Sequence, residues 1–241
     1  SDSAAVILAS GGAVVNAGVS DVTVGDAFVD AADGAALSAL EVQLDGVSNN
    51  TQSEINFRVE DSAAAIAAEV TADSTFLDGA NDLEVTSGTT DMIGAADIQG
   101  ITAYDSGASS YTISDSAEAV LTDANESTIL NDGVSGVVVT DATGVGYVDA
   151  SDGEALSELE VLLQTATNDS AADIEFRVED DAAAIASVLA TSGASLDGAE
   201  HLVVDSGDTT VQGAADIQGV TGYDAANSDY TITDTAGAIL Q

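Results

Sequence analysis

Aspartates beside glycines are the residues of this chain whose type and spacing best suit metal chemistry. Asp30 and Asp33 come just before one glycine, and Asp149 and Asp152 come just before another. Ca²⁺ binds six to eight oxygens, and carboxylates together with loop carbonyl groups supply such ligands. We therefore predict a Ca²⁺ site at each pair. The alternative is that Asp33 and Asp152 cap helices and that their partners are turn residues.

Further aspartates fit turns and helix starts. Asp78 and Asp197 each precede a glycine; we interpret both as turn residues and include them as candidate Ca²⁺ ligands. No loop has the D-x-D-x-D-G form of an EF-hand. Four more aspartates follow apolar strand patterns and precede alanine-rich runs, which predicts helix N-caps at Asp61, Asp115, Asp180 and Asp234.

Catalytic residue sets are sparse. His201 is the only histidine and there is no cysteine, which argues against a zinc site. A Ser-His-Asp triad would depend on this one histidine, and no serine lies in a G-x-S-x-G sequence. Paired carboxylates are abundant, but glycoside-cleaving sites usually add aromatic platforms, and the chain has no Trp. We expect the protein not to be an enzyme.

The charge of the chain excludes two classes of partner. The formal net charge is −41, with two Arg and no Lys. Phosphate neutralisation needs basic residues, so we expect no nucleic-acid binding, and anionic lipid is equally unsuitable. No segment has the length of apolar sequence that a membrane span needs, so we expect no membrane insertion. Repulsion of this size must be screened or neutralised by cations.

The sequence repeats itself at an offset of 119 residues. Ile55–Ile66 returns as Ile174–Ile185, and Tyr111–Ala117 returns as Tyr230–Ala236. No gap is needed from about Asp30 onwards, so loop lengths are kept as well as apolar positions. We take residues 1–121 as the first copy and residues 122–241 as the second. Because neither copy holds a catalytic set that the other lacks, a building block fits better than a catalyst.

Within each copy, apolar and polar residues alternate over short stretches that begin about 28 residues apart. This alternation predicts strands with one buried face. The expected strands are Ile55–Glu60, Leu83–Thr86, Tyr111–Ser114 and Val137–Thr140, with counterparts at Ile174–Glu179, Leu202–Asp205, Tyr230–Thr233 and, for the last, Gly18–Asp21 or the slightly later Val22–Val24. Helices or turns fit between them, which is the arrangement of parallel strands joined by crossovers.

The strongest helix pattern is Gly153–Gln164, with Asp152 at its start and its twin at Gly34–Leu44. Its expected apolar stripe is Leu156, Leu159, Val161 and Leu163. Alternating strands backed by helices on one face are typical of stacked β/α coils. We therefore predict an α/β repeat solenoid, with two compact α+β or β-sandwich domains as the alternative.

The segments YTISDSAEAVL and YTITDTAGAIL, together with GAADIQG, resemble repeats in very large secreted proteins of cyanobacteria and other aquatic bacteria. Those proteins are described as adhesins, haemolysin-like proteins or surface-layer components. The resemblance covers roughly residues 55–121 and 174–240. It implies an extracellular structural or adhesive role, with Ca²⁺ as a cofactor. The glycine-rich nonapeptide of β-roll calcium repeats is absent.

Arg58 and Arg177 are the only two basic side chains other than the histidine, and they occupy equivalent positions. An isolated arginine among carboxylates should form bidentate pairs. We interpret them as clamps between neighbouring coils of one chain; a contact between subunits is the alternative.

These observations together predict an extracellular structural protein that assembles head-to-tail into a filament or surface layer. The apolar segment Ala4–Leu8 is expected to pair in β fashion with the end of a second copy at Tyr230–Gln241. The alternative is a Ca²⁺-dependent adhesin segment of a larger secreted protein, with cell-surface glycans as its ligand class. The first residues, Ser-Asp-Ser without Met, suggest a processed polypeptide or a fragment.

Overall fold

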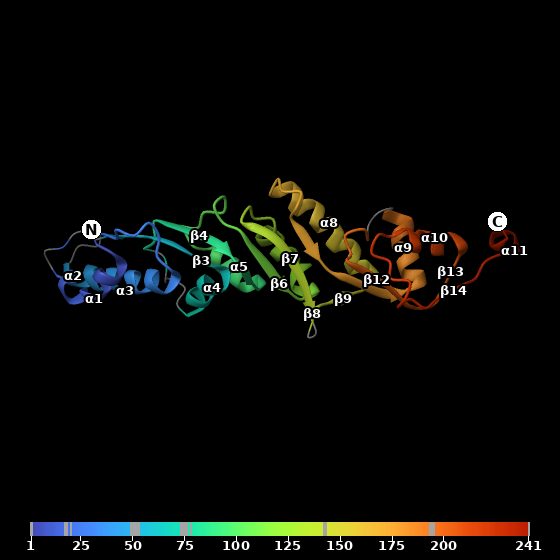
Figure 1. Cartoon of the computed structure of the whole chain (residues 1–241), viewed down its shortest axis with the longest axis horizontal. Coiled ribbons are helices and arrows are strands. Elements are labelled where there is room, and N and C mark those ends of the chain that lie inside the picture. The colour runs from blue at the N-terminus through green and yellow to red at the C-terminus, as the bar shows by residue number, and fades with distance from the viewer. Residues whose placement is uncertain are drawn as a thin grey trace. The chain divides into compact units, whose positions relative to one another are not determined.

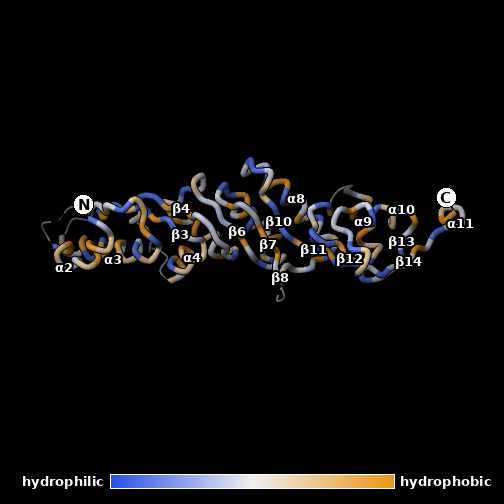
Figure 2. Tube along the Cα trace, viewed as in Figure 1, coloured by the Kyte–Doolittle hydropathy of each residue, from blue (hydrophilic) through white to orange (hydrophobic). Residues whose placement is uncertain are grey.

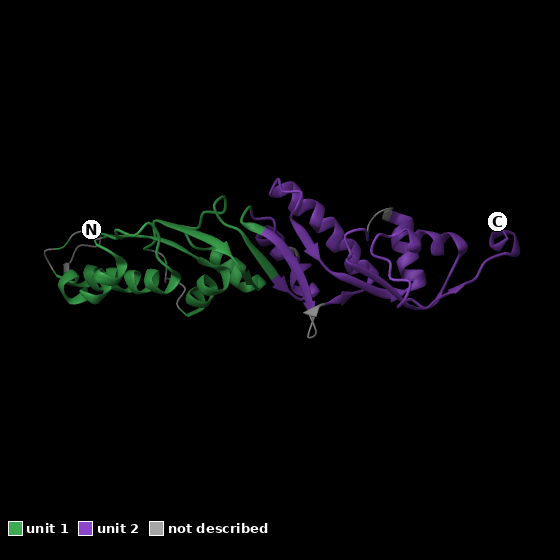
Figure 3. Ribbon diagram, viewed as in Figure 1, with its two compact units in different colours: residues 1–113, 132–134 green, residues 114–131, 135–241 purple. Residues whose placement is uncertain are grey.

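The computed structural model describes residues 2–16, 19, 21–48, 54–72, 77, 79–141, 144–192 and 196–240. Two compact units divide the chain (Figure 3). Unit 1 comprises residues 1–113 with 132–134, and unit 2 comprises residues 114–131 with 135–241. Each is a mixed α/β structure, and each is described by itself.

Unit 1 alternates short strands with helices (Figure 1). The helices contact the strands beside them and each other, with α4 packed between α3 and α5. In chain order its elements are α1 (Ala4–Ala9), α2 (Gly11–Val14), β1 (Asp21–Thr23), α3 (Ala31–Ser48), β2 (Glu54–Asn56), β3 (Arg58–Ser62), α4 (Ala63–Ala72), β4 (Asp82–Ser87), β5 (Thr89–Thr90), α5 (Met92–Gln99) and β6 (Tyr111–Asp115), whose last two residues belong to unit 2.

Unit 2 repeats this alternation after a more irregular start. Its helices α8, α9 and α10 pack in sequence, as α3, α4 and α5 do in unit 1. The elements are α6 (Ala117–Val120), the 3₁₀ turn η1 (Asp123–Asn125), α7 (Glu126–Ile129), β7 (Val134–Asp141), β8 (Gly144–Val145), β9 (Tyr147–Val148), α8 (Ala150–Ala166), β10 (Asp173–Glu175), β11 (Arg177–Asp181), α9 (Ala182–Ser192), β12 (His201–Ser206), β13 (Asp208–Thr209), α10 (Val211–Gly219), β14 (Thr231–Ile232) and α11 (Ala236–Ile239).

Apart from the pair β7–β8, the strand pairs of the described residues are parallel, as predicted. In unit 1, four passes of the chain lie side by side in the order Val29, Val59, Leu83 and Tyr104. The corresponding passes of unit 2 lie in the order Val148, Val178, Leu202 and Tyr223. Each residue in the second ladder is 119 positions after its counterpart in the first. Parallel pairing is not the pattern of a β-sandwich, whose strands are antiparallel.

The two copies differ where their ungapped alignment ends. Ile55 on β2 pairs with Val22 on β1, which confirms the later of the two expected positions for the first strand. Ile174, the counterpart of Ile55, pairs with Val137 on β7. An offset of 119 residues from Val22 would place this partner at position 141, four residues further along the chain. β7 also continues into an antiparallel pair with β8, an element that no sequence pattern indicated.

Alternation along the strands separates a buried from an exposed face. On β3, Val59 is fully buried whereas Arg58 and Glu60 are exposed. In unit 1 the helix α4 lies beside β3 and β4 (Figure 1) and contacts both strands, as α9 contacts β11 and β12 in unit 2. Hydrophobic and hydrophilic residues are accordingly interleaved along both units (Figure 2). The prediction of strands with one wet face is confirmed.

The long helices begin earlier than expected. α8 starts at Ala150 because Asp149, rather than Asp152, provides its N-cap. Leu156, Leu159 and Leu163 form the buried stripe as predicted, but Val161 is 63% exposed, so its inclusion was wrong. A period of 3.6 residues per turn places Val161 on a different side of the helix from the three leucines, and that side faces solvent.

Glycine lets both long helices approach the strands closely. A Cβ added to Gly34 would lie 2.8 Å from Val59 Cγ2, and one added to Gly153 would lie 2.7 Å from Val178 Cγ2. Real Cβ atoms rarely come this close, so a larger residue would push the helix from the sheet.

The N-terminal apolar run is a helix, not the β-pairing segment that we predicted. Ala4–Ala9 forms α1, which packs on α3 and buries Ala4 and Ile7. A short apolar run of alanine and larger aliphatic residues is compatible with a strand or with a helix. Here packing against α3 favours the helix. Val6 remains half-exposed.

Candidate functional site

The two aspartate pairs predicted as Ca²⁺ sites, Asp30 with Asp33 and Asp149 with Asp152, lie at the starts of the two long helices α3 and α8. Asp30 Oδ1 accepts a hydrogen bond from the Asp33 backbone N–H at 2.8 Å. Asp149 Oδ1 accepts one from the Asp152 N–H at 2.9 Å. These contacts are those of N-caps, so the capping residues are Asp30 and Asp149.

Asp33 and Asp152 are in the first helical turns rather than at the caps. Burial, and then the nearby charge of Asp149, raise the pKa of the Asp152 carboxyl. The two carboxylates of that pair therefore stand close enough to repel each other. Within the described ranges, however, no three side chains of His, Cys, Asp or Glu come together as a metal-binding group.

Asp78 lies outside the described residues. Asp197 is an exposed turn residue. It lines a pocket of unit 2 together with Asp216 of α10, while apolar residues of α9 and α10 form the other walls. No hydrogen bond holds these two carboxylates in a common ligand geometry among the bonds of the described chain.

A second set of aspartates ties successive layers together. These residues, which we call the bridging aspartates, each accept at Oδ2 a hydrogen bond from the first backbone N–H of a helix 22 to 30 residues earlier in the chain. A carboxylate at a helix N-terminus is favoured by the helix dipole and satisfies a free N–H group. The pairs are Asp26 with Ala4, Asp61 with Ala31, Asp180 with Ala150 and Asp234 with Val211, at 2.8, 3.0, 3.0 and 3.2 Å.

The prediction that Asp61, Asp180 and Asp234 are N-caps was therefore wrong by one residue. Each accepts at Oδ1 the N–H of the next residue, and that next residue caps the following helix. Ser116 likewise caps α6 in place of Asp115. The aspartate precedes the cap because its second oxygen reaches a different helix. Sequence reasoning missed this role, although the recurring Asp after each strand was its visible sign.

Arg58 clamps two strands. Its guanidinium donates to Asp82 Oδ2 from Nε at 2.9 Å and from Nη2 at 2.6 Å, and it reaches Glu84 Oε1 at 3.4 Å. It also lies over the Phe28 ring, 4.1 Å from the centroid. β3 and β4 carry these residues side by side, which confirms the interpretation as an intrachain clamp.

The equivalent arginine has a looser arrangement. Arg177 pairs with His201 in the strand ladder, where unit 1 has Asp82. Its Nε lies 3.6 Å from Glu200 Oε2, and its guanidinium lies 6.0 Å from the Tyr147 ring centroid. His201 is exposed, as expected, so it belongs to no buried catalytic set.

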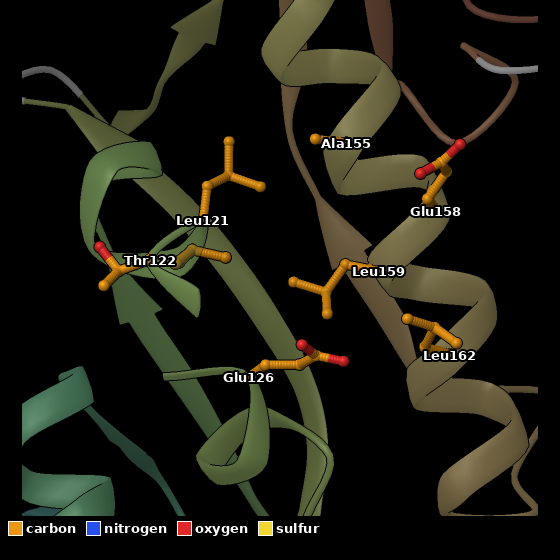
Figure 4. A pocket seen from close by; sticks show the side chains of 8 residues that line it. Leu121, Thr122, Glu126, Ala155, Glu158, Leu159 and Leu162 are labelled. Carbon is orange, nitrogen blue, oxygen red and sulfur yellow. The ribbon is translucent and has the colours of Figure 1, made fainter. Parts of the chain in front are cut away.

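One pocket of unit 2 lies between α8 and the segment that contains α6 and α7. It has a volume of about 250 Å³. Leu159 points from α8 toward the wall that carries Leu121 and Glu126, whereas the Glu158 carboxylate points away from it (Figure 4). The walls are largely aliphatic, and the Thr122 hydroxyl and the carboxylates of Glu126 and Glu158 are the polar side-chain groups that line the pocket.

The last layer of unit 2 exposes an apolar face. Ile232 on β14 is 45% exposed, although its counterpart Ile113 is fully buried. Ile239 on α11 is 55% exposed, whereas its counterpart Val120 is 1% exposed. Leu240 beside it is still more exposed. Two of these three side chains, Ile232 and Ile239, are therefore much more exposed than their counterparts 119 positions earlier.

None of the helices in the described ranges combines the length and hydrophobicity that crossing a bilayer requires. Comparison with known proteins gives no relative: no protein-family model, no curated protein and no solved structure matches the chain.

Proposed function

We propose that this protein is a structural building block that assembles head-to-tail into an extracellular filament or surface layer. The observation that carries the proposal is the apolar face of Ile232, Ile239 and Leu240. Isolated exposed aliphatic residues are ordinary on protein surfaces, but Ile232 and Ile239 occupy positions whose counterparts, Ile113 and Val120, are buried one copy earlier. A surface that matches an interior layer suits a covering layer of the same kind.

A second copy of the chain is the occupant that fits best. The last described layer presents β14, which pairs with β13 along one edge, together with the short helix α11. A layer that begins with another strand and helix would continue both elements. Such a contact joins two different surfaces of identical chains, and it propagates into a fibre when the rotation between copies does not close. Covering an exposed aliphatic side chain contributes up to roughly 1.5–3 kcal/mol.

The underlying architecture that we propose is a solenoid of stacked coils. Three features support it: the parallel four-pass ladder within each unit, the identical register of residues 119 apart, and the bridging aspartates that link helices of successive layers. In a stack of this kind each unit contacts only its neighbours, so growth by addition of units needs no other interface.

Charge sets the conditions for assembly. Two chains of net charge −41 repel each other, so association should require salt or bound cations. An extracellular setting supplies both. The resemblance to secreted repeat proteins of aquatic bacteria also supports this proposed location. We propose that the chain has no catalytic activity of its own.

Sedimentation velocity of three purified chains tests the proposal. We expect the unchanged protein to form polymers in high salt with Ca²⁺, and an Ile239→Asp variant to remain at 23.8 kDa. Ile93→Asp is the matched control, because Ile93 is an exposed isoleucine on α5 in unit 1 and is not one of the three residues of the apolar face. It should polymerise normally.

Two results would overturn the proposal. The unchanged chain could stay at 23.8 kDa under every salt and Ca²⁺ condition, which would favour the adhesin alternative. The Ile239→Asp variant could also polymerise as well as the control, in which case the apolar end face is not the joint.

A further inference from the structure

One face of α3 carries three oxygen-bearing side chains, and two of them have a buried oxygen without a hydrogen-bond partner. Ser38, Glu41 and Asp45 are spaced three and four residues apart, which places them along one side of the helix. Ser38 is 8% exposed, and its Oγ has no hydrogen-bond partner. Asp45 Oδ1 is likewise buried and unpartnered. An unsatisfied buried polar atom is destabilising, because it gives up its bonds to water without replacement, so such atoms commonly serve a ligand or an ordered solvent molecule.

Two of these side chains converge on one point beside the loop at Gly79. A Cβ added to Gly79 would lie 3.1 Å from Glu41 Oε2 and 3.3 Å from Ser38 Oγ. Both oxygens therefore point at the space that the missing side chain leaves open. Glu41 Oε2 is held in this direction because it also accepts the Ile55 backbone N–H at 3.0 Å.

The charge at this face has no protein counterpart. Burial, followed by the charges of Asp45 and Glu54, raises the pKa of the Glu41 carboxyl. The chain has no lysine, and Arg58 is engaged by carboxylates on β4. Two carboxylates one helical turn apart in partly buried surroundings favour a bound cation over water alone, since water leaves their repulsion unchanged.

The second copy shows the same face with one carboxylate replaced. Ser157 and Glu160 occupy the equivalent positions on α8, and both Ser157 Oγ and Glu160 Oε2 are buried without a partner. Glu160 Oε2 would lie 2.7 Å from a Cβ on Gly198. Where α3 has Asp45, α8 has Gln164, whose side-chain amide donates to Glu160 Oε1 at 3.0 Å and to the Ala172 carbonyl at 3.0 Å.

We propose that the Ser38–Glu41–Asp45 face of α3 binds a divalent cation of the calcium class against the Gly79 loop. Oxygen-only ligands, two of them carboxylates, suit Ca²⁺, and water completes a coordination number of six to eight. In unit 2 the side-chain amide of Gln164 donates a hydrogen bond to Glu160 and so takes over part of the role of the cation in unit 1. The α8 face should therefore bind a divalent cation more weakly than the α3 face. The site lies within unit 1 and does not depend on self-assembly.

Calorimetric Ca²⁺ titration of the full chain in high NaCl tests the site, because salt suppresses unspecific attraction to the acidic surface. We expect Asp45→Gln to weaken the tightest binding step by roughly tenfold or more. This variant reproduces an arrangement that α8 already contains, so it should fold. Glu60→Gln removes the same charge from an exposed position of β3 and should bind as the unchanged chain does.

The reciprocal change gives an independent readout. Gln164→Asp creates on α8 the carboxylate pair of α3, and it should add a second Ca²⁺ of comparable affinity to the titration. Equal binding by the unchanged chain, Asp45→Gln and Glu60→Gln would overturn the proposal, as would a Gln164→Asp variant with no added site. Neither result would bear on polymer formation.

Discussion

The bridging aspartates predict a stability effect that neither helix propensity nor surface charge would produce. In unit 2, Asp180 Oδ2 accepts the Ala150 N–H at 3.0 Å and Oδ1 accepts the Asp181 N–H at 2.7 Å. An Asp180→Asn substitution keeps the size of the side chain and one acceptor oxygen. Its amide nitrogen cannot accept the second bond, so one of the two backbone N–H groups loses its partner.

The expected loss follows from this geometry. A hydrogen bond to a charged group contributes about 1.5–3 kcal/mol, and removal of the charge also ends its interaction with the α8 dipole, worth about 0.3–1 kcal/mol. Relief of repulsion in a chain of net charge −41 offsets part of the sum. We expect a net destabilisation of unit 2 by about 1.5–3 kcal/mol.

Denaturant unfolding in high salt measures this loss. Asp208→Asn is the matched control, since Asp208 is an exposed residue of β13 in the same unit and the substitution removes the same charge. The control should change the free energy of unfolding by no more than about 0.5 kcal/mol. If Asp180→Asn and Asp208→Asn have equal effects, the bridging aspartates do not hold the layers together.

Three further outcomes are expected. The first concerns Glu41 in EDTA, where the raised pKa means that the carboxyl binds a proton more readily in the folded chain than in the unfolded one. The stability gained from this protonation is fully present below the usual pKa of a glutamate and is lost as pH rises through the raised pKa. Melting temperature should therefore rise on mild acidification from neutral pH, and Glu41→Gln should flatten this rise; an unchanged slope would refute the assignment. Millimolar CaCl₂ should raise the melting temperature more than NaCl of equal ionic strength, because site binding adds stability by mass action; identical melting curves would show that screening alone acts. Arg58→Lys should cost less than about 1 kcal/mol of unfolding free energy, since the ion pair with Asp82 is partly exposed; a cost of several kcal/mol would show that solvent screens the pair less than its exposure implies.

Local pattern predicted the strands and helices well wherever burial follows a simple period. The alternation around Val59 and Leu83 identified parallel strands with one buried face, because each side chain points alternately to helices or to solvent. The identical spacing of both copies also predicted that equivalent residues, 119 positions apart, take equivalent places in the two strand ladders. Helix starts were less accurate because a cap is defined by where its oxygen points. Asp149 and Asp152 are both plausible caps from sequence, and only the fold selects the first.

Interactions between layers were beyond sequence reasoning for a different reason. Asp180 looks like an ordinary cap until Ala150, 30 residues earlier, is placed beside it. Ser38, Glu41 and Asp45 look like the solvent face of an amphipathic helix, and it is the return of the chain at Gly79 that covers part of them. Such roles depend on the stacking of segments that are distant in sequence, which composition and period do not encode.

Electron microscopy of the purified chain tests the central claim most directly. Samples in low-salt EDTA and in high salt with Ca²⁺ would be compared at the same protein concentration. The account predicts single particles in the first condition and, in the second, filaments or ordered layers with an axial repeat of one chain. Single particles in both conditions, with the protein fully folded, would contradict head-to-tail assembly.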